Sequence, residues 1–330
     1  MMAKKFISAS VNPMLIILTL VIGSVDLLGQ QKVGTTSFQF LKVMPDGRAT
    51  GMADAVSAHV DGSIAVFHNP AGLTSVGHYD IMVSNYAYFF GVNTSSFSGA
   101  YTFPNVGSIG LQLIYTDIGS IEVTRVDQMG FVGEVYNPGL TGEVINPNHS
   151  ILGISFARAL TRQFSFGITS KHVTEDLGPK ATSGTLFDAG LIYDTDFRSI
   201  KTSAVIRNFG GDIQFVEGEY PAPQTLVIGV SANIIGPGSS LITTTDSNVL
   251  MFAFDLMGPR DYDQQYNLGF EWSYQEYLKL RSGYKFNYDT EGLSLGLGLH
   301  FKKFEFDYSY ANYGEYLPGV HRFSLGMSIK

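Results

Sequence analysis

Apolar and polar residues alternate along the C-terminal third of this 330-residue chain. Between residues 266 and 274, one set of alternate positions holds only Tyr, Leu, Phe and Trp, and the other holds Asn267, Gly269, Glu271 and Ser273. Successive side chains of a β-strand point to opposite faces, so the segment is predicted to be a strand with one apolar and one polar face. The same pattern recurs in four further segments, 278–288, 293–301, 304–310 and 322–329.

Similar segments precede these five. They lie at 81–90, 95–103, 107–117, 150–159, 163–173, 184–194, 201–209, 224–234 and 248–257. The total is about 14, and an even number is typical of a bacterial single-chain barrel. Segments of about ten residues cross a membrane at a tilt, and strands in lipid must close on themselves because every backbone group needs a partner. The pattern predicts an all-β fold, a transmembrane antiparallel β-barrel at 79–330.

A soluble β-sandwich would also alternate. Its strands are usually shorter, with turns every 8–12 residues or so. Here Tyr and Phe lie near the ends of the apolar faces and Leu lies in the middle, as in the aromatic belts of a membrane barrel. This distribution favours the barrel over the sandwich.

The connections between the segments differ in length. Long ones are expected at 118–148, 174–184, 210–223, 235–247 and 258–264. Short turns are expected at 104–107, 159–162 and 288–292. Because outer-membrane barrels carry short periplasmic turns and long outer loops, the two groups are predicted to lie on opposite sides of the membrane.

The N-terminus has the layout of a secretory signal peptide. Lys4 and Lys5 precede an apolar run at 14–22, and small residues follow up to Gly29. The run is shorter than a membrane-spanning helix, and none of that length follows residue 30. Residues 1–29 are predicted to direct export and to be removed, and the mature chain is expected in the cell outer membrane. An uncleaved anchor is the alternative.

Residues 30–78 do not alternate. The stretch 49–60 is rich in Ala, Gly, Met and Val and is predicted to form a short helix, which Asp61-Gly62 ends. A second helical turn is predicted from Ser63 to His68, before the turn at Asn69-Pro70. Small residues let backbones pack closely, so the segment is predicted to be a helical plug, or hatch, in the barrel mouth. A periplasmic cap is the alternative.

Three stretches of this segment resemble the PorV/PorQ family, which belongs to the FadL-like outer-membrane barrels. They are Phe-Gln-Phe-Leu-Lys-Val at 38–43, Gly-Arg-Ala-Thr-Gly-Met-Ala-Asp-Ala at 47–55, and His-Asn-Pro-Ala-Gly-Leu at 68–73. The resemblance covers roughly residues 31–330. The plug residues that it marks as candidates for a structural or binding role are Arg48, Gly51, Met52, Asn69, Pro70, Ala71 and Gly72.

The resemblance implies a 14-stranded barrel with an N-terminal hatch and leaves two functions open. PorV-like proteins act in type IX secretion and bind the C-terminal signal domains of exported proteins. In that case the loops 118–148 and 235–247 would form the contact surface, with Phe131, Val132, Val135 and Tyr136 as partner-binding candidates.

The alternative is a FadL-like transporter of hydrophobic small molecules. It predicts an apolar pocket at the plug and a lateral opening in the wall, for which Phe89-Phe90-Gly91 could supply a kink. A structural outer-membrane protein without a ligand, in contact only with lipid, is a third hypothesis.

Composition and charge agree with a barrel and exclude some functions. The chain has 37 Gly, 13% aromatic and only 15% charged residues, as is typical of barrels. It has no Cys, which excludes disulfides, thiolate metal sites and a cysteine nucleophile. A net charge of −8 argues against a nucleic-acid partner.

Ionisable residues on the polar strand faces are predicted to point into the lumen. They are Glu271, Lys279, Arg281, Lys285, His300, Glu305, Asp307 and Arg322. The simplest expectation is a set of cross-strand ion pairs. Contacts with a ligand or with the plug are the alternative, and Arg48 is a candidate to pair with Glu305 or Asp307.

No motif indicates an enzyme, a cofactor or a metal ion. Gly296-Leu297-Gly298 lies within an alternating segment and has no helix after it, unlike a phosphate-binding loop. His59, Asp61 and Ser63 are close in sequence, but a catalytic triad is defined by geometry and not by sequence proximity. His59 and His68 lack a third ligand at usable spacing.

Overall fold

The structure is a computed structural model that describes residues 34–215, 217–275 and 277–329. These residues belong to the unit Lys32–Lys330. The predicted signal peptide and its cleavage site lie outside the described residues.

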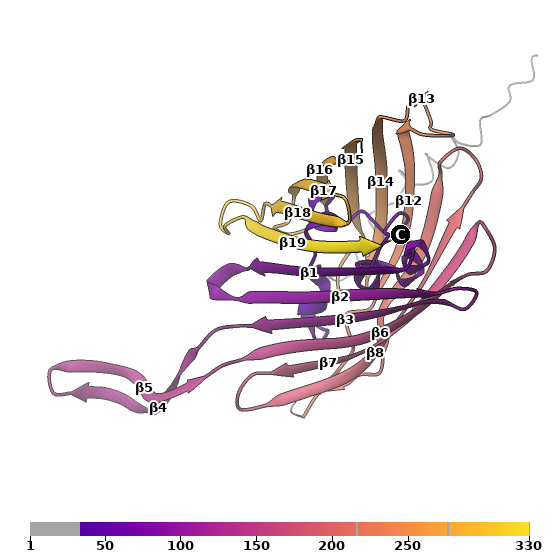
Figure 1. The fold of residues 1–330 in the computed structure, drawn as a ribbon. Helices are drawn as coiled ribbons and strands as arrows, with labels where there is room; N and C mark the ends of the chain where they lie inside the picture. The colour runs from indigo at the N-terminus through magenta and orange to yellow at the C-terminus, as the bar shows by residue number, and fades with distance from the viewer. Residues whose placement is uncertain (1–33, 216, 276, 330) are drawn as a thin grey trace, which may run out of the picture. The chain divides into compact units, whose positions relative to one another are not determined.

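Fourteen strands form the barrel (Figure 1). They are β1 (Tyr79–Ala87), β2 (Asn93–Phe103), β3 (Gly107–Asp117), β6 (Asn148–Ala159), β7 (Phe164–Asp176), β8 (Ala181–Asp194), β9 (Lys201–Gly210), β12 (Thr225–Gly236), β14 (Asn248–Pro259), β15 (Gln265–Tyr274), β16 (Leu278–Phe286), β17 (Leu293–Phe301), β18 (Phe304–Ala311) and β19 (Val320–Ile329). Each pairs with its neighbours in antiparallel orientation, β1 pairs with β19, and β9 pairs with β12. These last two pairings close the sheet, so the predicted 14-stranded antiparallel barrel is confirmed.

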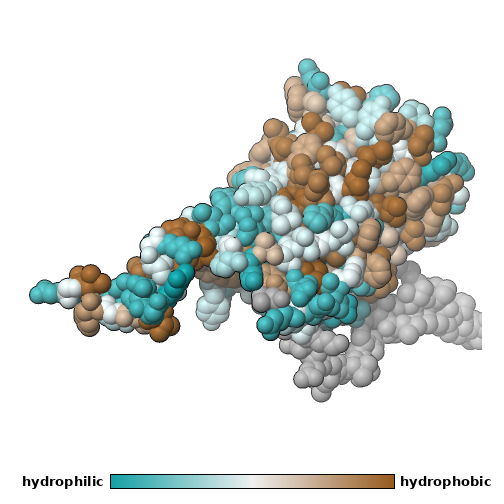
Figure 2. Space-filling model, turned by 90° about the horizontal axis from the view of Figure 1, so that it is seen from below, coloured by the Kyte–Doolittle hydropathy of each residue, from teal (hydrophilic) through white to brown (hydrophobic). Residues whose placement is uncertain are grey.

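The apolar faces of the strands point outward. On β19, Leu325 is 55% exposed, whereas its neighbour Ser324 is 2% exposed. On β17, Leu295 and Leu299 are exposed and Ser294 is buried. Figure 2 shows hydrophobic side chains over the outer wall. A sandwich would bury its apolar faces in a core, so the sandwich alternative is wrong.

The connections alternate between the two ends of the barrel because consecutive barrel strands are antiparallel. We call the end that holds the start of β1 and the finish of β19 the terminal end, and the other the hairpin end. Residues 118–147 lie at the hairpin end, but residues 237–247 lie at the terminal end. The expectation that these two loops share one surface is therefore wrong. The short turn 287–292 lies at the hairpin end, because strand order and not loop length decides the end.

Three connections contain strands of their own. The longest forms a hairpin of β4 (Ile121–Val132) and β5 (Val135–Ile145), which extends away from the barrel in Figure 1. A small hairpin of β10 (Ile213–Gln214) and β11 (Glu219–Tyr220) lies between β9 and β12. β13 (Thr243–Thr244) adds a short parallel pairing to β12.

The wall has no kink at Phe89-Phe90-Gly91. These residues form η3 (Phe89–Gly91), a turn that joins β1 to β2, so the predicted strand 81–90 ends at Ala87. Phe90 adopts a left-handed conformation with φ of 56°, which reverses the chain and leaves its ring 92% exposed. The chain reversal at this turn ends the strand at Ala87.

Residues 34–78, which we call the N-terminal segment, contain four short helices. They are η1 (Gln39–Lys42), α2 (Gly47–Gly51), α3 (Ala65–His68) and η2 (Pro70–Ser75). The helix predicted at 49–60 ends early, because Ala53 and Asp54 are left-handed, with φ of 54° and 60°. No helix in the described residues has the length and apolar character to cross a membrane.

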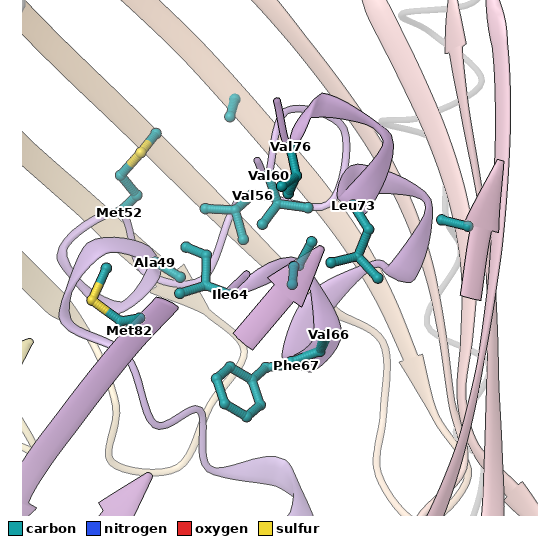
Figure 3. Packing of buried hydrophobic residues seen from close by; sticks show 14 of the residues in the cluster. Ala49, Met52, Val56, Val60, Ile64, Val66, Phe67, Leu73, Val76 and Met82 are labelled. Carbon is teal, nitrogen blue, oxygen red and sulfur yellow. The ribbon is translucent and has the colours of Figure 1, made fainter. Parts of the chain in front are cut away.

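The N-terminal segment packs against the inner face of the wall. Its buried residues include Val56, Ile64, Val66 and Leu73, which cluster with small wall residues such as Ala253 (Figure 3). The segment is thus held in the lumen by an apolar core of its own, although the lumen wall is polar.

Glycines permit this close approach. A Cβ on Gly51 of α2 would lie 2.9 Å from the Cα of Gly296 on β17. A Cβ on Gly269 of β15 would lie 2.7 Å from the carbonyl oxygen of Met52. Real Cβ atoms do not come so close, so backbone meets backbone here only because these positions are Gly.

Candidate binding site in the barrel lumen

The Asn-Pro-Ala-Gly motif forms a fixed turn against the wall. Asn69 caps η2 by accepting a hydrogen bond from Ala71 N at 3.1 Å. Its amide also donates to Ser57 O at 2.8 Å, which joins two parts of the segment. Asn69, Pro70, Ala71 and Gly72 are all buried. In this structure the motif positions the segment.

A carboxylate on the wall also holds the segment, and the sequence analysis did not identify it. Asp255 of β14 accepts hydrogen bonds from Val56 N at 3.2 Å, Ser57 N at 3.0 Å and Ser57 Oγ at 2.7 Å. In the sequence, the only indication of this role is that Asp255 is an acidic residue among the apolar residues 249–257.

A second such carboxylate lies at the hairpin end. Asp261 accepts hydrogen bonds from Thr36 Oγ1, Gln39 Nε2 and Lys42 Nζ at 2.6–2.7 Å. All three donors belong to one stretch of seven residues, 36–42, of the N-terminal segment. This one loop side chain therefore fixes η1 to the rim of the barrel. In the sequence, Asp261 lies in the long connection expected at 258–264, and no pattern marks it further.

Five of the eight lumen residues form one network of charges. Arg281 of β16 donates to Glu271 at 2.6 Å and to Asp307. Lys279 pairs with Glu305 at 3.1 Å, and Glu305 also lies 3.9 Å from Arg281. Because Glu271 and Arg281 are directly opposite on β15 and β16, part of this network is cross-strand pairing.

The other three lie apart from this network. Lys285 pairs with Asp54 of the N-terminal segment at 2.7 Å and with Glu291. The guanidinium of Arg322 stacks on Tyr86 at 4.5 Å and donates to Met44 O at 3.2 Å. Among the described residues, the side chain of His300 bonds only to Lys302 O, at 2.8 Å.

Arg48 links the N-terminal segment to the charge network. It pairs with Asp61 of the same segment and lies 3.9 Å from Glu271 of β15. Neither Glu305 nor Asp307 is within ion-pair distance of it in the described residues, so the expected pairing with them is wrong. Glu305 pairs instead with Lys279, and Asp307 with Arg281.

The predicted partner-binding residues lie at the tip of the β4–β5 hairpin. Phe131, Val132 and Val135 are each more than 70% exposed, and Tyr136 is 51% exposed. The rings of Phe131 and Tyr136 are 5.4 Å apart. The tip is therefore an exposed apolar surface outside the lumen.

The histidines of the N-terminal segment have separate surroundings. His68 is buried and bonds to Asp46 at 2.6 Å. Both ring nitrogens of His59 are shielded and have no hydrogen-bond partner in the part of the chain that the structure describes. Burial, followed by the nearby Arg48, lowers the pKa of His59 to about 4. Among the residues that the structure describes, no three His, Asp or Glu side chains are grouped to hold a metal ion.

Two cavities lie at opposite ends of the N-terminal segment. The hairpin-end cavity has a volume of about 210 Å³, and its lining includes Leu41, Met44, Met257 and Tyr288. The terminal-end cavity has a volume of about 280 Å³, and its lining includes Arg48, Lys279 and Glu305 together with Ile64 and Val76. The two cavities share no lining residue. Both linings mix apolar and charged side chains, since Lys42, Lys285 and Glu291 also line the hairpin-end cavity.

The solved structures to which this one is similar include two toluene transporters and a FadL homologue. The toluene transporter TbuX of Ralstonia pickettii aligns with a TM-score of 0.56 and 11% identity, over 87% of this chain and 99% of that one. The toluene transporter TodX of Pseudomonas putida aligns with a TM-score of 0.53 and 12% identity, over 87% and 98%. A FadL homologue of Pseudomonas aeruginosa aligns with a TM-score of 0.51 and 11% identity, over 87% and 99%.

At these identities the likeness concerns the fold. No protein-family model matches the sequence, and no curated protein matches it. The chain has the fold of FadL-like barrels, and no match connects it with the PorV/PorQ family.

Proposed function

We propose that this chain is an outer-membrane channel for apolar small molecules, closed at rest by its N-terminal segment. The observation that carries the proposal is the cavity of about 210 Å³ between η1 and the wall, where Leu41, Met44 and Met257 lie beside polar and charged side chains. Ligand sites in proteins are concave and largely apolar, with a few placed polar groups. The likeness to toluene transporters in fold supports the same function.

The proposal assigns a role to each part of the chain. Residues 1–29 direct export, residues 30–78 form the plug, and residues 79–330 form the barrel. The terminal end holds the start of β1, the finish of β19 and most of the short turns, so it faces the periplasm. The hairpin-end cavity therefore faces the outside of the cell. Passage through the lumen then requires the plug to shift or the wall to open.

Mass spectrometry of the purified protein tests this proposal. The mature protein is extracted from native membranes in mild detergent, and proteins and small molecules that accompany it are identified together. Bound apolar small molecules without a stoichiometric protein partner support the channel. Secreted proteins with a common C-terminal domain, and no apolar compound, would refute it.

That second outcome corresponds to the other candidate, a shuttle for exported proteins of the type IX kind. One observation favours it, the exposed apolar tip of the β4–β5 hairpin. An isolated two-stranded hairpin is only marginally stable in water, so a partner that packs on it would stabilise it. Replacing residues 122–144 with a short Gly-Ser turn separates the two candidates. The channel keeps its bound small molecules after this change, whereas the shuttle loses its protein partner.

A further inference from the structure

The turn that joins β17 to β18 at the terminal end carries two cations without a counter-ion. Lys302 and Lys303 are both exposed, and no carboxylate of the described residues is within ion-pair distance of either. The two carboxylates of β18, Glu305 and Asp307, face the lumen and pair with cations of β16. Both ammonium groups are therefore available to an anion outside the barrel.

The backbone of this turn is fixed at both of its carbonyl groups. The side chain of His300 donates to Lys302 O at 2.8 Å, and Ser328 N of β19 donates to Lys303 O at 2.8 Å. Lys302 is left-handed, with φ of 56°, a conformation that Gly or Asn adopts with less strain. The turn itself thus does not require Lys, and it presents both Lys side chains from a fixed backbone.

The ammonium groups lie over aromatic rings on the outer face of the wall. Lys302 Nζ is 5.4 Å from the ring centroid of Phe301, and Lys303 Nζ is 5.8 Å from that of Phe304. The two Phe residues are paired across β17 and β18 and are 65% and 49% exposed. Long cationic side chains lay their stems along apolar surface and keep the charge at its polar edge. The two charges therefore lie at the edge of the lipid-facing wall.

An apolar surface continues from these rings toward the middle of the wall. Leu299 pairs with Phe306, Phe306 pairs with Leu325, and all three are exposed. The connections at the hairpin end carry exposed carboxylates instead, such as Glu219 and Asp263. Charge complementarity therefore favours an anionic head group at the terminal end, with its acyl chains on this apolar surface.

We propose that the β17–β18 turn binds an anionic phospholipid. Lys302 and Lys303 bind the phosphate of the head group, and the acyl chains lie on the outer face of β17, β18 and β19. A zwitterionic phospholipid compensates its phosphate with its own cation, so it binds less tightly. In the orientation proposed above, the site lies in the periplasmic leaflet. The inference goes beyond the channel function, because it does not depend on what passes through the lumen.

The single Trp of the chain can report on lipid beside this turn. Trp272 of β15 alternates with buried lumen residues such as Glu271, so its ring faces outward. Its row of paired residues passes through Leu280 to Leu297 of β17. The acyl chains of a lipid whose head group lies at Lys302 would reach this row. Bromine atoms on those chains would therefore quench the fluorescence of Trp272.

The test compares two brominated lipids at equal mole fractions in vesicles of phosphatidylcholine that contain the mature protein. Brominated phosphatidylglycerol is expected to bind near Trp272 about fivefold more tightly than brominated phosphatidylcholine at low salt, because each Lys near a membrane surface contributes on the order of a fivefold gain. High salt is expected to reduce the preference. Equal quenching by the two lipids at low salt would overturn the inference.

Lys302→Asn combined with Lys303→Gln removes both charges, and Asn suits the left-handed backbone. The preference for phosphatidylglycerol is expected to disappear, while quenching by brominated phosphatidylcholine stays the same. Lys302→Arg combined with Lys303→Arg keeps both charges and is expected to keep the preference. Lys180→Gln is the matched control, since Lys180 is an exposed cation at the hairpin end, and it is expected to keep the preference.

A preference that survives in the uncharged double variant would show that the turn is not the lipid site. A preference that Lys180→Gln also abolishes would show that net charge and not this turn attracts the lipid, and the inference would again be wrong. If the uncharged double variant fails to fold, Lys303→Gln alone is expected to reduce the preference severalfold, and an unchanged preference would overturn the inference. Arg158 and Arg162 are also exposed at the terminal end, but they lie far from β15 in the strand order, so Trp272 does not report on them.

Discussion

Arg281 has carboxylates on both sides in the lumen, with Glu271 at 2.6 Å, Asp307 also bonded to it, and Glu305 at 3.9 Å. Its side chain is fully buried. A buried network of ion pairs adds little to the free energy of unfolding when it is compared with apolar residues of similar volume. Removing one member, however, leaves the others as buried charges without a partner. Substitution of Arg281 therefore tests how much the paired charges of the lumen matter to the stability of the barrel.

Arg281→Met is expected to destabilise the folded barrel by about 3–5 kcal/mol, because Glu271 and Asp307 lose their cation. The measurement is the temperature at which the folded form disappears from SDS gels without prior boiling. Arg125→Met is the control, since the pair of Arg125 with Glu143 is exposed and contributes roughly 0–1 kcal/mol. Equal unfolding temperatures for the two variants would contradict the account.

His59 should make stability depend on pH. Burial, then Arg48, lowers its pKa in the folded state to about 4, whereas an unfolded His titrates near 6.5. Between these values the unfolded chain binds a proton that the folded chain does not, so stability rises with pH across the window. His59→Leu is expected to reduce the loss of stability between pH 6.5 and 4.5. If His59→Leu leaves the loss of stability between pH 6.5 and 4.5 unchanged, the pKa of His59 is not lowered by folding, and the account of this residue is wrong.

At the scale of elements, alternation predicts strands well and other features poorly. Each of the 14 segments read from the sequence overlaps a barrel strand, because one face of each must meet lipid and the other must not. Alternation does not predict turns, breaks in helices or the end of the barrel at which a loop lies. It missed the break at Ala53 and Asp54, the turn at Phe90, and the end of the barrel to which 237–247 belongs.

The candidate site was predictable only in part, for a similar reason. Charged residues on polar faces are visible in the alternation, as Glu271 and Arg281 are. Asp255 lies in an equally regular strand, but its importance depends on what lies across the lumen, and that is set by the path of the N-terminal segment. The irregular pairing of β8 with β9 between Phe187 and Ala189 leaves no mark in the pattern at all.

The contact between α2 and the wall gives a prediction at this scale. Gly269→Ala places a Cβ about 2.7 Å from Met52 O, so α2 must move away from β15. Overpacking of this kind is expected to destabilise the protein by about 1–3 kcal/mol and to increase proteolysis within residues 34–78. Gly211→Ala is the control, because no atom lies within 4 Å of its added Cβ. Equal rates of proteolysis in the two variants would contradict tight packing of the segment.

At the scale of the whole chain, the N-terminal segment separates two cavities that share no lining residue. If the segment is a plug, the intact protein passes few ions and its removal opens the lumen. Deletion of residues 34–75, with the signal peptide retained, is expected to raise single-channel conductance in planar bilayers by a large factor. Replacing the hairpin residues 122–144 leaves conductance low. A wild-type protein that conducts as well as the deletion variant would show that the segment is not a plug.

The central claim is that this barrel admits apolar small molecules through an outer membrane. Its most direct test is the initial rate of uptake of a labelled apolar compound, such as toluene, by cells that carry an intact outer membrane and either express or lack the protein. The account predicts faster uptake in the expressing cells, with no change for a sugar of similar size. Equal uptake of the apolar compound in the two strains, at matched amounts of folded barrel, would contradict it.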